Sequence, residues 1–153
     1  MTLHFEPAQL RDADELVALR IAAMRPSLEQ LGRFDPQRAR ARFLAHFTPA
    51  CTQHLVVAGQ RVGVLVLRRD GEYLLLDHLY VHPDHQGQGI GAAVLAEVFR
   101  QAKTQGLPVK VTALRGSRSN DFYQRHGFGL VEESEWDLVY VRNPRAERET
   151  AGS

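Results

Sequence analysis

The sequence lacks several features that would place it in a specialised class. Its single cysteine, Cys51, cannot form an internal disulfide, which favours a reducing compartment and a cytoplasmic protein. It has no signal peptide and no apolar run near the ~20 residues of a membrane span, so no membrane partner is expected. Nineteen Lys and Arg residues balance 18 Asp and Glu residues, which leaves no field to select nucleic acid.

What remains is the composition of an ordinary globular enzyme or binding protein. The chain has 153 residues, of which 44% are hydrophobic and 24% charged. We predict one domain over residues 1–144 and a polar C-terminal tail over residues 145–153. The apolar pattern gives the order β-α-α-β-β-β-α-β-α-β-β, which is an α/β mixed sheet flanked by helices. One helix is expected to begin with a capping box at Asp12 and to end at Pro26.

The segment Tyr80–Ala93, YVHPDHQGQGIGAA, carries the strongest functional signal. An apolar strand runs into a polar turn, then into Gly87, Gly89 and Gly91 at alternate positions, and then into an amphipathic helix. Glycines let a ligand approach the backbone, and the first amides of a helix together with its dipole attract anions. The pattern therefore predicts an anion site, most naturally for a pyrophosphate.

Three glycine loops could fit this segment. A P-loop is excluded because no lysine follows the glycines. The dinucleotide fingerprint is formally met by Gly87, Gly89 and Ala92, but five residues separate the strand from the first glycine. The next strand also ends in Leu114 and Arg115 instead of an acidic residue. The third pattern, Gln-x-x-Gly-x-Gly, is filled by Gln86, Gly89 and Gly91.

A second block, Ser119–Phe128 (SNDFYQRHGF), follows the glycine segment after one strand. The two blocks together resemble the acyl-CoA loop and the later FYxxxGF segment of the GNAT superfamily of N-acetyltransferases, over Asp77–Phe128. The resemblance implies a central sheet that splays apart, with acetyl-CoA as co-substrate. It assigns cofactor binding to the backbone of Leu79, Tyr80 and Val81, to the loop and helix start, and to Asn120. The loop and helix residues are Gln86, Gly87, Gln88, Gly89, Ile90, Gly91, Ala92 and Ala93.

Two polar residues within these blocks could perform acetyl transfer. The resemblance places Tyr123 near the thioester sulfur, where a phenol can protonate the leaving thiolate; otherwise its ring packs against the neighbouring helix. Asp77 interrupts an apolar strand, so it either serves as a base acting through water or pairs with an arginine across the sheet. His78 points to the opposite face of that strand, where a satisfied buried histidine is expected. For Asn120, helix capping competes with cofactor contact, and Ser117 stands where many members of the family carry asparagine.

No metal is expected, because the histidines and aspartates near the loop match no common zinc spacing. The function predicted is transfer of an acetyl group from acetyl-CoA to a primary amine, either a small molecule or a peptide amine. The alternative is a non-catalytic module that binds and senses acyl-CoA. The first helices carry acceptor candidates, Arg20, Arg25, Glu29, Arg33 and Asp35, with Trp136 on a late strand. The sequence does not identify the acceptor, and it leaves open whether the protein forms a homodimer.

Overall fold

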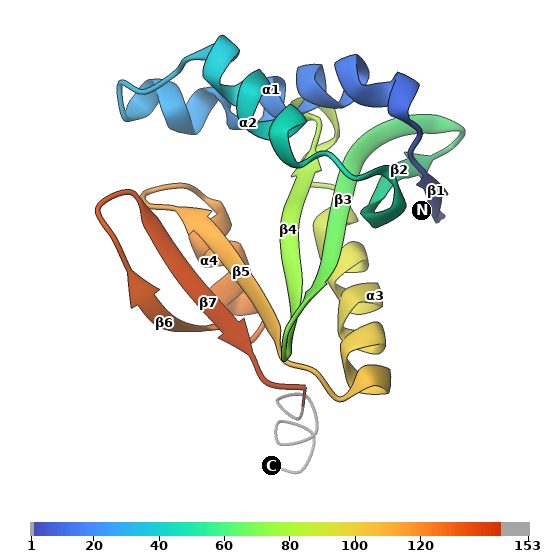
Figure 1. Cartoon of the computed structure of the whole chain (residues 1–153), viewed down its shortest axis with the longest axis vertical. Helices are drawn as coiled ribbons and strands as arrows, with labels where there is room; N and C mark the ends of the chain where they lie inside the picture. Colours follow the sequence, from blue (N-terminus) through green and yellow to red (C-terminus); the bar gives the residue numbers. More distant parts are fainter. Residues whose placement is uncertain (1, 145–153) are drawn as a thin grey trace. The chain divides into compact units, whose positions relative to one another are not determined.

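The observed helices and strands follow the predicted order closely. The computed structural model describes residues 2–144, so the predicted tail at 145–153 lies outside the described part. The elements are β1 Leu3–Pro7, α1 Ala13–Gln30, α2 Pro36–His46, β2 Thr52–Val57, β3 Gln60–Asp70, β4 Tyr73–Val81, α3 Ile90–Gln105, β5 Val109–Leu114, α4 Ser119–Arg125, β6 Gly129–Glu133 and β7 Asp137–Arg142 (Figure 1). Short 3-10 turns, η1 Leu10–Asp12, η2 Pro49–Cys51 and η3 Pro83–His85, lie between them.

The strands of the described residues form a seven-stranded mixed sheet in the order β1-β2-β3-β4-β5-β7-β6. Strands β4 and β5 pair in parallel, whereas the pairs β1–β2, β2–β3, β5–β7 and β6–β7 are antiparallel. The parallel ladder covers Leu74–Leu76 opposite Val109–Val111. A ladder of three residue pairs is short for strands of nine and six residues, which agrees with a splayed sheet. The predicted mixed α/β fold class is confirmed.

Internal contacts divide the chain into two compact units, and each is described by itself. Unit 1 contains described residues 2–66 and 78–94, and unit 2 contains 67–77 and 95–144. Strands β3 and β4 and helix α3 each lie partly in unit 1 and partly in unit 2. The single domain over residues 1–144 stays a prediction.

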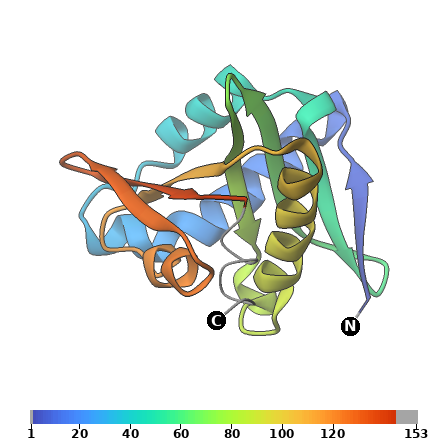
Figure 2. The same ribbon diagram turned by 90° about the horizontal axis from the view of Figure 1, so that it is seen from below.

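Unit 1 packs its two N-terminal helices on one face of strands β1 to β4. Leu16 and Val17 of α1 and Phe43 of α2 are buried with Val64 and Val66 of β3 in one apolar cluster. Burying one such side chain stabilises a fold by about 1.5–3 kcal/mol, so this cluster is what holds the helices to the strands. Strand β1 lies beside β2 at the edge of the sheet (Figure 2).

Unit 2 is held together in part by aromatic side chains of α3, of α4 and of the segment that follows α4. Phe128 contacts both Phe99 of α3, with ring centroids 5.8 Å apart, and Tyr123 of α4, at 5.3 Å. The Arg142 guanidinium lies 3.6 Å from the centre of the Phe99 ring, and its Nε donates to the carbonyl of His126 at 3.0 Å. The hydrogen bond from Arg142 to His126 fixes strand β7 to the end of α4.

The prediction that the first helix ends at Pro26 is wrong, because α1 continues to Gln30 with Pro26 inside it. A proline inside a helix removes its own amide hydrogen bond and crowds the carbonyl four residues before it, but the amides that follow it can still donate. Arg25 and Glu29 form an ion pair at 2.6 Å across this turn, and the Leu31 amide donates to the Ser27 carbonyl at 3.3 Å. These later contacts keep the last turn helical.

Strands β3 and β4 approach each other closely at Gly63. A Cβ atom there would lie 2.4 Å from the Tyr80 carbonyl oxygen and 2.8 Å from Leu55 Cδ1. The register of β2 and β3 also shifts between Leu55 and Val56 beside this glycine. The backbone of β4 in unit 1 is therefore positioned by a residue that has no side chain.

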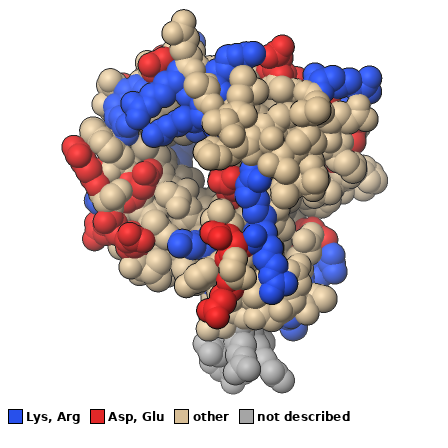
Figure 3. Space-filling view, viewed as in Figure 1, with Lys and Arg blue, Asp and Glu red and all other residues tan. Residues whose placement is uncertain are grey.

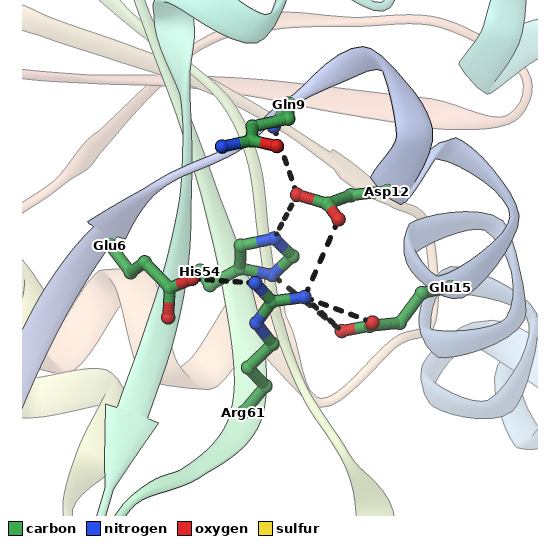
Figure 4. Close-up of polar contacts among 6 residues, drawn as sticks. All are labelled: Glu6, Gln9, Asp12, Glu15, His54 and Arg61. Carbon is green, nitrogen blue, oxygen red and sulfur yellow. Dashed lines mark hydrogen bonds and ion pairs between the residues drawn. The ribbon is translucent and has the colours of Figure 1, made fainter.

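A network of charged side chains fixes the N-terminal segment to the sheet of unit 1 (Figure 4). Asp12, at the end of η1, accepts a hydrogen bond from the Gln9 amide at 2.9 Å and contacts His54 Nε2 at 2.9 Å. Arg61 of β3 reaches Glu6 of β1 at 2.5 Å and Glu15 of α1 at 3.0 Å. The network joins β1, η1, α1, β2 and β3.

Asp12 therefore caps the η1 turn that precedes α1, and it does not form the predicted capping box with Glu15. Asp12 is 7% exposed and His54 is 1% exposed. The hydrogen bond with His54, followed by that from the Gln9 amide, lowers the pKa of Asp12 to about 2. The ionised carboxylate is thus the form that the fold stabilises.

We expect Asp12→Asn to destabilise the protein at neutral pH, with a difference from wild type that shrinks in acid. The pKa of Asp12 in the folded state, about 2, is below its ordinary value of 3.8. The stabilisation is therefore complete above pH 4 and is lost as the pH falls through 2. Urea unfolding followed by circular dichroism from pH 7 to pH 3 measures this.

Asp14→Asn is the matched control, because Asp14 lies two residues further on, in the first turn of α1, with its side chain 82% exposed in an ion pair with Arg40. Exposed pairs contribute little. An effect of Asp12→Asn no larger than that of Asp14→Asn, or one independent of pH, would contradict the assigned role.

We expect Gly63→Ala to lower stability by about 1–3 kcal/mol, since the added methyl group meets the Tyr80 backbone carbonyl as well as the Leu55 side chain, and the backbone cannot move aside cheaply. Gly129→Ala on β6 is the control, because its Cβ would lie 4.0 Å from the nearest atom, the Val141 carbonyl oxygen. Chemical unfolding of both variants tests this, and equal stabilities would show that β3 and β4 can separate freely.

Candidate active site

The glycine loop adopts a backbone that only glycine takes up readily. Gly87 and Gly89 have φ values of +80° and +81°, in the left-handed region. A Cβ atom at either position would meet nothing within 4 Å. The backbone conformation, and not a lack of space, therefore requires glycine at both positions. Open space faces the loop.

The loop ends at the N-terminus of α3, which is suited to an anion. Ile90 is 2% exposed and anchors the helix in the core, while Gln88, Gly89 and Ala92 are exposed. The Ala93 amide donates to the Gly89 carbonyl at 3.1 Å, and the amides that precede it in the helix have no intrahelical acceptor. The first turn carries no acidic residue that would repel a phosphate. The loop is therefore suited to an anionic group, and the binding of a pyrophosphate there stays a prediction.

Side chains within the loop brace it from inside. Gln86 Nε2 donates to the Val81 carbonyl at 2.9 Å, and His82 Nδ1 accepts from the Asp84 amide at 3.1 Å. The predicted cofactor residue Gln86 thus has a clear structural role, in closing the loop on the end of β4. A direct contact of its side chain with the cofactor stays a prediction.

In unit 1 the β4 segment is the last strand of the sheet, beyond β3. The His82 amide, directly after the end of β4, donates to the Val62 carbonyl of β3 at 2.8 Å and so holds the end of β4 to β3. Leu79, Tyr80 and Val81 are half-buried there. Backbone groups on the outer side of such a strand can pair with an extended ligand, as the predicted pantetheine contacts require.

Asp77 forms an ion pair with Arg68 of β3. The Arg68 Nε atom lies 2.8 Å from Asp77 Oδ2, with the two side chains 23% and 29% exposed. This is the cross-sheet pairing that the sequence left open as the alternative to a base. The pairing gives Asp77 a structural partner, and its role as a base stays a prediction.

Tyr123 lies in α4 and is 5% exposed. Its ring contacts Phe122 and Phe128, each with a centroid distance of 5.3 Å. Both interpretations of this residue therefore survive, because the ring packs in the core of unit 2 whether or not its hydroxyl donates a proton.

Asn120 is occupied within unit 2. Its Nδ2 donates to the carbonyls of Leu114 and Ser117, both at 2.9 Å, and its Oδ1 accepts from the Tyr140 hydroxyl at 2.9 Å. The side chain holds the turn between β5 and α4 to β7. A cofactor contact donated by the Asn120 amide nitrogen would have to replace one of these bonds.

The contact between His78 and Tyr80 on β4 was not predicted from the sequence. His78 Nδ1 lies 3.0 Å from the Tyr80 hydroxyl, and the His78 ring lies 5.6 Å from the ring of Phe43 on α2. The i, i+2 spacing on one strand was the available signal. As expected, His78 faces the helices of unit 1.

Several acceptor candidates of the first helices have structural roles. Arg20 is buried and donates to the Ala39 carbonyl at 2.8 Å, Arg25 pairs with Glu29, and the Asp35 carboxylate caps α2 through the Arg38 amide. Arginine side chains nevertheless gather over the α1–α2 segment (Figure 3). Arg38, Arg40 and Arg42 are exposed there.

Over residues 2–144, no group of three or more His, Cys, Asp or Glu side chains is arranged to hold a metal ion. In the same part of the chain, no helix is both long and apolar enough to cross a membrane. A cavity of about 210 Å³ beside the charged network is lined in part by Glu15, His54, Arg61 and His82.

Comparison with known proteins defines the class. The acetyltransferase (GNAT) domain family matches residues 51–129, which is more than half of the chain. The chain therefore belongs to the GNAT acetyltransferase family.

Individual relatives are more distant. The chain is 32% identical over 71 residues to the L-amino acid N-acyltransferase MnaT of Escherichia coli. It is 28% identical over 74 residues to an L-methionine sulfoximine/L-methionine sulfone acetyltransferase of Salmonella typhimurium. These matches cover 46% and 48% of this chain but only 41% and 43% of the two relatives.

The fold is shared with a PaiA N-acetyltransferase from Thermoplasma acidophilum in complex with coenzyme A. The TM-score is 0.76 at 14% identity, over 94% of this chain and 99% of the other.

Proposed function

We propose that the chain transfers an acetyl group from acetyl-CoA to a primary amine. The observation that carries the proposal is the glycine loop, whose open left-handed backbone leads into the N-terminus of a 16-residue helix with no acidic first turn. A pyrophosphate is the anion that such a loop holds well. The family to which the chain belongs and the coenzyme A bound by a protein of the same fold support the choice of acetyl-CoA.

The thioester, when bound, supplies an activated carbonyl carbon. The chain must then orient it, take a proton from the attacking amine and give one to the departing sulfur. The loop amides orient the pyrophosphate end, and the outer edge of β4 orients the arm. The Tyr123 hydroxyl donates the proton to sulfur, since a phenol with an ordinary pKa of about 10 stays protonated at pH 7.

For the acceptor, we propose a small amine of the amino-acid type as the first class to test. The two curated relatives are described as acting on an L-amino acid and on L-methionine sulfoximine or sulfone. Exposed arginines on α2 could attract the carboxylate of such a molecule. Release of free thiol from acetyl-CoA across a panel of amino acids, amino-acid derivatives, polyamines and peptide amines tests the reaction and its acceptor together.

Gly89→Glu should abolish coenzyme A binding without unfolding the protein. The glutamate places a negative charge and a side chain where the pyrophosphate would lie. The open space spares it a steric clash, and the strain of a positive φ is the same in the control variant below. Isothermal titration calorimetry with coenzyme A measures the loss.

Gly106→Glu controls for the strained backbone, because Gly106 also has a positive φ, +68°, and open space at its Cβ, but follows the C-terminal end of α3. If both glutamates reduce affinity equally, the loop is not the pyrophosphate site.

Tyr123→Phe should lower kcat by about 10²–10⁴-fold while changing the affinity for acetyl-CoA little. Phenylalanine preserves the ring contacts with Phe122 and Phe128, so the variant removes the hydroxyl alone. Steady-state kinetics on the best acceptor, with calorimetry for binding, separates the two effects. Activity within a few-fold of wild type would assign protonation of sulfur to another donor.

A further inference from the structure

Helix α2 in unit 1 carries basic side chains that no acidic residue of the helix balances. Residues 36–46 include three arginines and no Asp or Glu. Arg40 forms an ion pair with Asp14 of α1 at 2.8 Å. Arg38 and Arg42 are exposed, and neither side chain has a hydrogen-bond or ion-pair partner among residues 2–144.

Arg38 and Arg42 together form the arginine face of α2. They stand four positions apart on the helix, where like charges repel each other. Arg38 also lies in the first turn, where the positive end of the helix dipole disfavours a cation. An acidic surface laid against this face would relieve both repulsions.

The hairpin of β6 and β7 in unit 2 carries the opposite charge. Residues 126–141 contain four acidic residues and no Lys or Arg. Glu133 is held by Arg115 Nη2 at 2.9 Å. The other three carboxylates are exposed and have no ion-pair partner within the described residues; these are Glu132, Glu135 and Asp137, which define the acidic hairpin.

Hydrogen bonds hold the tip of the acidic hairpin in one conformation. Arg115 also donates from its side chain to the Ser134 carbonyl at 2.8 Å, and its amide donates to the Trp136 carbonyl at 2.7 Å. The Ser134 amide donates to the Asp137 carbonyl at 2.8 Å. A surface that is already ordered loses little conformational entropy when it binds a partner.

Both surfaces also expose apolar side chains. Six large apolar residues are exposed in the described part of the chain, and four of them lie on α2 or on the hairpin: Leu44, Leu130, Val131 and Trp136. Apolar side chains rimmed by charged ones are typical of surfaces that bind another protein.

The charge of the whole chain favours a second copy as the partner. Nineteen basic and 18 acidic side chains leave a net charge of +1, so two copies approach without strong net repulsion. Pairing of the two β6 edges with each other is disfavoured, because Glu132 and Glu133 would lie near the same residues of the other copy. The shift in strand register between Leu130 and Glu132 would also interrupt such a ladder.

We propose that the chain forms a homodimer in which the arginine face of α2 in one copy docks on the acidic hairpin of the other. Each surface lies within one unit, and the contact joins unit 1 of one copy to unit 2 of the other. Two-fold symmetry makes the same contact twice. The guanidinium groups thereby meet the carboxylates that have no ion-pair partner in the single chain. This contact does not depend on acetyl transfer.

The test uses two charge-reversed variants of the full-length chain, Arg38→Glu with Arg42→Glu, and Glu132→Arg with Glu135→Arg. Sedimentation velocity over a range of protein concentrations measures dimerisation. Wild type should dimerise, more weakly at high salt. Each variant alone should raise the dissociation constant at least about tenfold, because like charges then face each other. An equimolar mixture of the two variants should restore dimers, because each reversed helix then meets a reversed hairpin.

Arg11→Glu with Arg69→Glu is the control, because it makes the same change of charge at exposed arginines outside both surfaces and should dimerise as wild type does. Circular dichroism checks that every variant is folded. A wild type that stays monomeric at low salt overturns the proposal, as do reversed variants that dimerise normally. A mixture that stays monomeric also overturns it, because the two surfaces then do not meet between copies.

Discussion

The turn from β4 into α3 is the constraint on which the rest of the candidate site depends. Two residues with positive φ, Gly87 and Gly89, reverse the chain within a few residues and leave the first amides of a long helix facing open space. Gln86 fastens the turn to the end of β4. The same backbone that would hold an anion therefore also fixes the strand that precedes it, so binding and positioning share one local geometry.

Titratable residues in this protein have different roles according to the side chains that they contact. Asp77 is next to His78 in the chain, yet one meets an arginine across the sheet and the other meets a tyrosine hydroxyl and an aromatic ring. Their side chains leave opposite faces of the strand, so adjacent positions enter unrelated environments. The carboxylate is stabilised as a partner in an ion pair, whereas the imidazole contacts a hydroxyl group and aromatic rings.

The first helices illustrate how much polar chemistry is used for support. The charged network around Asp12 and His54 joins the N-terminal strand to its neighbours, and Arg20 fastens α1 to α2. Such buried polar groups stabilise a fold only when their partners are in place. The region that carries the acceptor candidates is thus held by its own ion pairs and hydrogen bonds, and its exposed arginines remain on the surface of α2.

The sequence by itself determined the order of elements and the glycine loop, because turn residues and apolar periodicity act over a few positions. The family was indicated by the resemblance of two motif blocks to a known superfamily. It could not determine that α1 passes through Pro26, that Asp77 pairs with Arg68, or that Asp12 meets His54 42 residues away. Those outcomes depend on strand register and on which elements pack together, and long-range contacts of this kind leave no local pattern. Only the tertiary structure decided them, since a side chain's partner is set by the fold around it.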